Sequence, residues 1–335
     1  MMSNKISVIV PVYNAGGTLR ECLSAIFNSD YKEFEVIVVD DNSTDDSVII
    51  AKEFAARIIL FSSNKGVAAA RNKGVEEAKG DYLLFVDSDC IIKPDSIAKV
   101  VDGLSKDNSI SGIAGIYALH NRFNNFLSQY KHLIEYYRGI TCEDVNRHSF
   151  RGAFFAVRKG VFDSVRFDES LKNASIEDIE FGRELIASGH KFLLDKSIEV
   201  EHVKKRTLKG FFRNQFFRSK DIARSFFAKK SYKFYLSKKR KSVYAKLYFL
   251  RVPVSLALFA ALCGFLITGN SAYLYPALFL SILPVFLEYE FLKFCLKQKG
   301  LGFVIQCIFV YFFDGLVSAL GVFAGLVKSL TERKV

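Results

Sequence analysis

The first 120 residues alternate short, nearly continuous apolar runs with stretches of helical periodicity. Apolar runs rich in Val, Ile and Leu indicate strands that are buried on both faces, and helices between them allow the strands to pair in parallel. The predicted strands are SVIVPVY, FEVIVVDD, RIILF and YLLFVDSD, and the predicted helices are TLRECLSAIF, the segment that NSTDDS begins, and residues 68–78. The pattern predicts an α/β, Rossmann-like domain with a mainly parallel sheet.

The chain becomes strongly apolar again after residue 247. A membrane helix needs roughly 20 mostly apolar residues, and three stretches reach or approach that length. They are YFLRVPVSLALFAALCGFLITG, YLYPALFLSILPVFLEY and LGFVIQCIFVYFFDGLVSALGVFAGLV. We therefore expect a transmembrane region of two to four helical segments over residues 247–335, with a soluble helical domain as the alternative. The third stretch either crosses once or breaks into a hairpin at Asp314 and Gly315.

Residues 204–246 lie between these two parts and combine cations with aromatic residues. Sixteen Lys and Arg against one acid, Asp221, give this segment a net charge of +15 in a chain of net charge +12. A nucleic-acid surface is one interpretation of such a segment. The apolar stretches that follow favour another, in which amphipathic helices lie on an anionic membrane surface. We expect membrane lipids as partners and no nucleic acid.

The same cations orient the chain, because cationic loops stay on the cytoplasmic side of a membrane. The N-terminus shows no signal peptide, and the six cysteines lack the spacing of a zinc site or a disulfide framework. The expected organisation is an α/β domain over residues 1–203, interfacial helices over 204–246 and membrane helices over 247–335. Such a protein would be integral to the inner or plasma membrane, with its α/β domain in the cytoplasm.

Acidic residues gather where two of the predicted strands end. Asp40 and Asp41 follow one strand, and Asp87 and Asp89 follow another. Ligands of doubly wound sheets bind at this edge, and one or two carboxylates together with substrate phosphates are the usual ligands of Mg²⁺ or Mn²⁺. Helix capping explains the first pair equally well. It does not explain the second pair, because the segment CII that follows does not begin a helix.

Four motifs of the α/β domain occur together in a fixed order. They are SVIVPVYN, VIVVDDNSTDDS, NKGVAAARNKG and LLFVDSDC, and RGAFFAVRKGVF, SIEDIEFGREL and VEHV follow them. At this spacing they resemble the family 2 glycosyltransferases, over roughly residues 5–220. The resemblance implies the GT-A fold and an inverting, metal-dependent transfer of a sugar from a nucleotide-diphosphate donor. The implied cofactor is Mn²⁺ or Mg²⁺.

The resemblance also implies a role for each matching residue. The residues that match nucleotide contacts are Pro11, Tyr13, Asn14, Asp41, Arg71 and Asp87. The implied metal ligands are Asp89 and His202. The residues that match a diphosphate-binding stretch are Arg213, Gln215 and Arg218. This last stretch also belongs to the amphipathic segment, so its sequence supports either role.

The acceptor site is expected at SIEDIEFGREL. Asp178 matches the general base, with Glu177 beside it and Glu180 as the nearest competitor, although acids also favour the start of a helix. A hydroxyl acceptor needs a base, whereas a phosphate acceptor is already an anion. We therefore expect a hydroxyl of a lipid-linked saccharide at the cytosolic leaflet. A polyprenyl-phosphate acceptor is one alternative, and a non-catalytic, membrane-anchored nucleotide-sugar-binding scaffold is the other.

Overall fold

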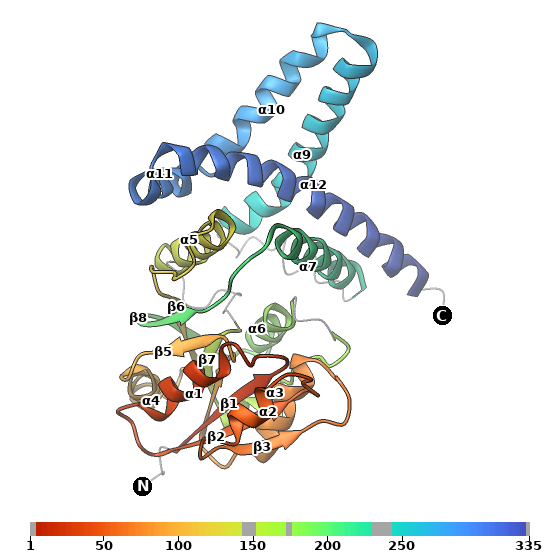
Figure 1. Cartoon of the computed structure of the whole chain (residues 1–335). Helices are drawn as coiled ribbons and strands as arrows, with labels where there is room; N and C mark the ends of the chain where they lie inside the picture. Colours follow the sequence, from red (N-terminus) through yellow and green to blue (C-terminus); the bar gives the residue numbers. More distant parts are fainter. Residues whose placement is uncertain (1–4, 143–151, 172–175, 229–242, 333–335) are drawn as a thin grey trace. The chain divides into compact units, whose positions relative to one another are not determined.

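A computed structural model describes residues 5–142, 152–171, 176–228 and 243–332. The chain forms two units (Figure 1). The sheet unit comprises the residues up to Asn124 together with Arg138–Lys205, and the helical unit comprises Asn125–Tyr137 together with the residues from Arg206 onward. Each unit is described by itself below.

In the described part of the sheet unit, eight strands form one mixed sheet in the order β3-β2-β1-β4-β7-β6-β8-β5. Strands β3, β2, β1 and β4 are parallel, β7 is antiparallel to β4 and β6, and β5 is antiparallel to β8. The strands are β1 Ile6–Val12, β2 Phe34–Asp40, β3 Arg57–Leu60, β4 Tyr82–Val86, β5 Cys90–Ile92, β6 Gly112–Tyr117, β7 Phe154–Arg158 and β8 Phe192–His202.

Apolar cores cover both faces of this sheet. Alternate residues of β1 enter different cores, because successive side chains of a strand point to opposite faces. Val8 and Val10 join one core, and Ile9 joins the other. The helices of the sheet unit are α1 Leu19–Phe27, α2 Ser47–Ala51, α3 Val67–Glu77, α4 Ser96–Lys106 and α6 Glu177–Ala187, with the 3-10 helix η1 Lys159–Asp163. The predicted α/β domain with a mostly parallel sheet is confirmed.

The helical unit contains the chain's long apolar helices. Its elements are α5 Phe126–Ile140 as far as Tyr137, α7 Leu208–Ala228, α9 Val243–Thr268, η2 Ser271–Tyr273, α10 Leu274–Leu287, α11 Tyr289–Lys299 and α12 Leu301–Glu332. Among the described residues, one helix is long and apolar enough to cross a membrane, over Leu301–Thr331. The other two apolar stretches, Val252–Thr268 and Ser271–Leu287, are shorter. They form an antiparallel hairpin (Figure 1).

The α12 helix runs without a break through Asp314 and Gly315. The alternative of a hairpin at these residues is therefore wrong. The helix stays continuous here because Asp314, which is 2% exposed, accepts a hydrogen bond of 2.6 Å from Gln215 Nε2 of α7. A charged residue that finds a partner inside the helical unit does not need to leave the helix for water.

Candidate active site

Several chain segments converge at one edge of the sheet. The carboxyl ends of β1, β2 and β4 share this edge because the three strands are parallel, and Val12 pairs with Asp40 there. Strand β7 begins at the same edge, since Phe154 pairs with Val86 in an antiparallel register. The pairing of Cys90 with His202 brings the end of β8 to the segment that follows β4. Loops from distant parts of the sequence therefore surround one location.

The loop after β1 is tied to the loop after β2 by side-chain hydrogen bonds. The backbone N–H of Asn14 donates to Ser43 Oγ at 2.9 Å, and Asn14 Oδ1 accepts from the N–H of Thr44 at 2.8 Å. Asn14 adopts a left-handed backbone conformation with φ of 51°, which asparagine tolerates. Tyr13, beside it, is 54% exposed. This loop presents an aromatic ring from a fixed backbone, as a base-stacking residue requires.

Asp41 is buried and anchors the start of α3. Its two carboxylate oxygens accept hydrogen bonds from the backbone N–H groups of Lys65, at 2.6 Å, and Gly66, at 2.8 Å. Gly66 has φ of 95°, a conformation that favours glycine. Asp41 therefore also has a structural role, and its expected contact with a base must use a remaining lone pair of the carboxylate.

Arg71 of α3 is the centre of the site and is only 1% exposed. Its guanidinium donates to Asp87 Oδ1 at 2.9 Å, to Glu177 Oε1 at 3.2 Å and to the carbonyl oxygen of Gly152 at 3.1 Å. A planar guanidinium suits this task because its five N–H donors point outward in a fixed fork. Arg71 thereby links the end of β4, the start of α6 and the segment that enters β7.

Asp178 is held at the start of α6 by two backbone donors. Its Oδ2 accepts from the N–H of Gly152 at 3.0 Å, and its Oδ1 accepts from the N–H of Ile179 at 2.8 Å. A Cβ at Gly152 would lie 2.7 Å from the Cβ of Asp178, so glycine is required for this approach. Asp178 is half-buried. Glu180 is 2% exposed and pairs with Arg183 at 3.0 Å.

Glu177 is a buried carboxyl with an unusual environment. Burial and, to a smaller extent, the neighbouring Asp178 raise its pKa, Arg71 lowers it, and the net effect is a pKa of about 7. Its Oε2 has no hydrogen-bond partner among the described residues. Glu177 therefore carries a proton more readily than an ordinary glutamate, whereas Asp178 beside it is more exposed.

Asp89 and His202 lie together, although 112 intervening residues separate them in the sequence. His202 Nε2 lies 3.3 Å and Lys204 Nζ lies 3.2 Å from Asp89 Oδ2. Burial acts to raise the pKa of Asp89, but His202 and Lys204 outweigh it and hold that pKa below its usual value. The ring of Tyr117 stacks on His202 with centroids 4.9 Å apart.

The donor set of Asp89 and His202 fits a divalent cation that completes its shell elsewhere. No cluster of three or more His, Cys, Asp or Glu residues with metal-site geometry occurs in the described ranges. Mg²⁺ and Mn²⁺ commonly keep several waters and substrate phosphate oxygens beside one or two protein ligands. One carboxylate and one imidazole are thus enough for a cation that arrives with a diphosphate.

The remaining predicted residues are distributed between the two units. Pro11 lies within β1, opposite Val39 of β2. Arg213, Gln215 and Arg218 belong to α7 of the helical unit, so their role at a diphosphate stays a prediction.

Sequence reasoning missed Lys204 and Gly152, which contact Asp89 and Asp178 directly. The motif VEHVKK places Lys204 two residues after His202, which is the signal that was available for it.

Residues 7–166 match the family model described as "Glycosyl transferase family 2". Glycosyltransferase GlyG of Streptococcus pneumoniae is 38% identical over 130 residues, which are 37% of this chain and 43% of that protein. The poly-beta-1,6-N-acetyl-D-glucosamine synthase of Staphylococcus epidermidis is 27% identical over 201 residues, 58% of this chain and 48% of that one. The chain spans less than half the length of either relative.

One solved structure shares the fold over nearly the whole chain. It is the mannosyltransferase PcManGT of Pyrobaculum calidifontis in complex with GDP-Man and Mn²⁺, with a TM-score of 0.59 and 17% identity. The match covers 98% of this chain and 88% of that one. At this identity the likeness concerns the fold, and it confirms the GT-A-like architecture.

Proposed function

The chain carries a glycosyltransferase family 2 domain, and from this premise we propose that it transfers a sugar from a nucleotide-diphosphate donor to a hydroxyl of a membrane-associated saccharide, with inversion. The observation that carries the proposal is the link through Arg71, which joins Asp87 on the donor side to Glu177, next to Asp178, on the acceptor side. In this proposal residues 1–203 form the transferase domain, residues 204–246 the interfacial helices and residues 247–335 the membrane region.

The donor would lie across the edge where β1, β2 and β4 end. Tyr13 would stack on the base, since its ring is exposed and its loop is fixed. Pro11 and Asn14 would shape that loop, and Asp41 would contact the base. Asp87 would contact the ribose or the sugar, because its carboxylate keeps 31% of its surface exposed while one oxygen bonds to Arg71.

Asp89 and His202 would hold Mn²⁺ or Mg²⁺ together with diphosphate oxygens. The cation, when bound, neutralises charge on the departing nucleoside diphosphate. The Pyrobaculum structure contains this pairing of a nucleotide sugar with Mn²⁺, and the proposal extends it to this chain. Arg213, Gln215 and Arg218 remain proposed diphosphate contacts.

Asp178 would act as the general base. The acceptor oxygen attacks the anomeric carbon as the bond to the diphosphate oxygen breaks, and the acceptor proton moves to the Asp178 carboxylate. The N–H groups of Gly152 and Ile179 orient that carboxylate. Glu177 would act as a positioning residue, because it is buried behind Asp178 and pairs with Arg71.

The proposed acceptor is a lipid-linked saccharide at the cytosolic leaflet. A base at Asp178 is useful for a hydroxyl and unnecessary for a phosphate. The apolar α12 helix supports attachment to the inner or plasma membrane, and the name of the staphylococcal relative describes a polymer with sugar-to-sugar linkages. A polyprenyl phosphate is the second acceptor that an assay must include.

The test uses the full-length protein purified in detergent with Mn²⁺ and a panel of nucleotide sugars. Release of nucleoside diphosphate is measured with a saccharide-lipid acceptor and, separately, with a polyprenyl phosphate. We expect turnover with at least one donor and its loss in Asp89→Ala. Turnover only with the polyprenyl phosphate would overturn the hydroxyl acceptor. The absence of turnover and of donor binding, with Asp89→Ala behaving identically, would overturn transferase activity.

A further inference from the structure

The distribution of residues on α12 is the opposite of that on a helix in water: its exposed face is apolar and its buried face carries small and polar residues. A stripe of exposed large apolar residues runs along the outside, about 100° wide at 3.6 residues per turn. Its main members are Ile305, Phe309, Phe313, Leu320, Phe323 and Leu330. The opposite, buried face carries small or polar residues, among them Asp314, Ser318, Gly321, Gly325 and Ser329. Small and polar residues inside with large apolar residues outside are typical of helices that meet lipid.

The C-terminal half of α12 packs very closely on α7. A Cβ at Gly321 would lie 2.4 Å from the carbonyl oxygen of Phe216, and one at Gly325 would lie 2.3 Å from that of Lys220. Residue numbers increase together along the two helices, so they run in parallel. Because the two helices lie side by side, α7 and this half of α12 would lie at the same depth in a membrane.

The α7 helix cannot cross a hydrocarbon core. It has 21 residues, and its charged residues occur along most of its length rather than at its ends. They are Lys209, Arg213, Arg218, Lys220, Asp221 and Arg224. Each charge near the centre of a membrane helix opposes insertion strongly. A helix of this kind remains at the headgroup level, and so does the half of α12 that it contacts.

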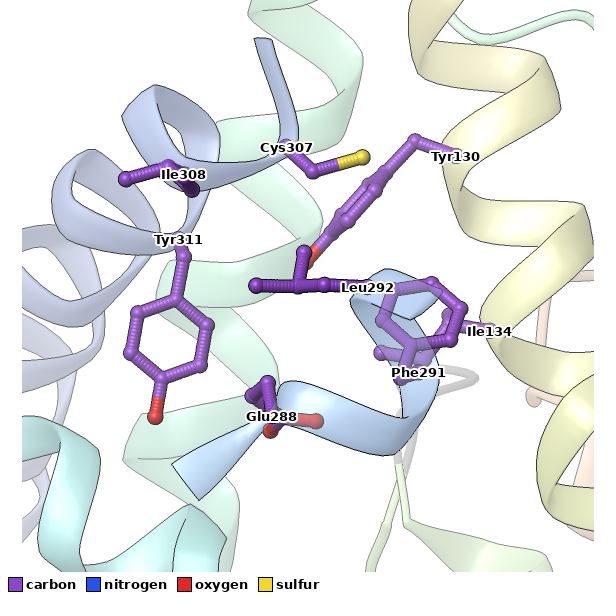
Figure 2. A pocket seen from close by; sticks show the side chains of 8 residues that line it. All are labelled: Tyr130, Ile134, Glu288, Phe291, Leu292, Cys307, Ile308 and Tyr311. Carbon is purple, nitrogen blue, oxygen red and sulfur yellow. The ribbon is translucent and has the colours of Figure 1, made fainter. Parts of the chain in front are cut away.

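The N-terminal half of α12 packs on two other helices, α5 and α11, both of which carry charged residues. Phe303 contacts Phe126 of α5 with ring centroids 4.9 Å apart. Tyr311 and Cys307 line a small cavity together with Tyr130 of α5 and Phe291 of α11 (Figure 2). Its volume of about 10 Å³ is close to the space that one water needs. Helix α11 carries Glu290, Lys293, Lys297 and Lys299.

The α9–α10 hairpin differs, because residues 252–287 contain no Asp, Glu, Lys, Arg or His. Its apolar residues near the turn are highly exposed, for example Ile267 at 83% and Tyr275 at 77%. The turn is tight, since a Cβ at Gly264 would lie 2.7 Å from the Tyr273 ring. No charged side chain in residues 252–287 therefore opposes insertion into hydrocarbon.

We propose that α12 lies in the plane of the membrane surface beside α7 and that the α9–α10 hairpin is the element inserted into an anionic phospholipid leaflet. This proposal rests on the membrane attachment proposed above, and it changes the topology expected from length and apolarity alone. Lys328, near the end of α12, then stays on the same side of the membrane as Arg213 and Lys220, with the outward stripe of α12 resting on the acyl boundary.

The test uses depth-dependent fluorescence quenching, since the chain contains no tryptophan. Phe313→Trp, near the middle of α12, and Leu330→Trp, near its end, place two reporters on the outward stripe, about 26 Å apart along a helix. Phe279→Trp, at a site that is 66% exposed on α10, reports on the hairpin. Each full-length variant is reconstituted in anionic phospholipid vesicles with lipids brominated either near the headgroup or deep in the acyl chain.

An in-plane α12 predicts equal quenching profiles at 313 and 330, both stronger with the shallow bromines, and a deeper profile at 279. A deep profile at 313 with a shallow one at 330 would show a spanning helix, because residue 313 would then lie near the bilayer centre, and would overturn the proposal. Absence of quenching at all three sites would overturn the lipid contact itself. Nucleoside diphosphate release is measured on the same samples, so loss of transferase activity and a wrong topology give separate readouts.

Discussion

The sheet unit and the helical unit distribute polar residues in opposite ways. In the described part of the sheet unit, apolar residues fill the interior, and a group of buried charged residues lies beside the strand ends, where Arg71 meets Asp87 and Glu177. In the helical unit, α12 turns glycine, serine and aspartate inward and phenylalanine and leucine outward. Removing apolar area from water stabilises the interior of the sheet unit. If the helical unit meets lipid, as proposed above, close contact between its helices would contribute more.

This difference separates two kinds of substitution. In the sheet unit, removing a charge affects both the chemistry and the pairing of a buried partner. In the helical unit, adding a single methyl group on the inward face is enough to disturb the packing. Each prediction below therefore compares a substitution at a buried or catalytic position with a control substitution at an exposed position. The difference between the two variants in activity or stability tests the contrast between the units.

The largest expected effect is on catalysis in the sheet unit. Asp178→Asn keeps the shape of the side chain but removes the base, so transfer should fall about 10²–10⁴-fold, while donor affinity stays unchanged. Initial rates and donor binding measure the two quantities. Asp102→Asn is the control, since Asp102 is exposed on α4 beside Lys106. Undiminished transfer in Asp178→Asn would assign the role to Glu180 or to no carboxylate in this helix.

The next effect is on stability. Arg71→Met leaves Asp87 and Glu177 without their buried cation, which typically costs about 3–5 kcal/mol. We expect a clearly lower midpoint of thermal unfolding for the full-length protein in detergent. Arg20→Met is the matched control, because Arg20 pairs with Glu53 on the surface, where solvent screens such pairs and they contribute little to stability. Equal shifts for the two variants would contradict a central role of Arg71.

A smaller effect is expected in the helical unit. Gly325→Ala places a methyl group against α7, and overpacking of this kind costs about 1–3 kcal/mol. Gly302→Ala, in the first turn of the same helix, meets open space and should be neutral or stabilising, because alanine is the better helix former. Midpoints of thermal unfolding compare the two variants. If Gly325→Ala were as stable as Gly302→Ala, the close approach of α12 to α7 would be disproved.

The smallest effect concerns pH. The pKa of Glu177 is raised in the folded state from an ordinary 4.5 to about 7, so the folded protein binds more protons than the unfolded chain between these values. Its contribution to stability is therefore complete below pH 4.5 and decreases as the pH rises through 7.

Glu177→Gln should reduce the change in the free energy of unfolding between pH 5.5 and pH 8 by about 1–2 kcal/mol. Thermal unfolding in the presence of a chelator measures it, with Asp102→Asn as the control. An unchanged slope would mean that Arg71 and Asp87 compensate for the lost carboxyl.

Local pattern was sufficient for the first four strands and the helices between them, because each apolar run and each helical period lies within a short window. It was insufficient for the second half of the sheet. The antiparallel pairing of Cys90 with His202 depends on residues more than 100 positions apart, and no single window contains both.

The site was partly predictable for the same reason. The positions of Asp41, Asp87 and Asp89 follow from the ends of strands, and the structure places them at one sheet edge. The burial of Arg71 could not be read from its helix, since its carboxylate partner Glu177 lies 106 residues away. Likewise, the sequence left open a break at Asp314 and Gly315, because Gln215, the partner of Asp314, lies 99 residues away.

The contact between α7 and α12 has a consequence for how the protein is made. A ribosome completes α7 about 70 residues before it begins α12, so the inward face of α7 waits for its glycine-bearing partner while α9, α10 and α11 are made. A chain that stops before residue 301 would leave Ser219 and Ala223 without Gly321 and Gly325, which approach them in the structure. The close packing between α7 and α12 can therefore form only after the intervening helices have been synthesised.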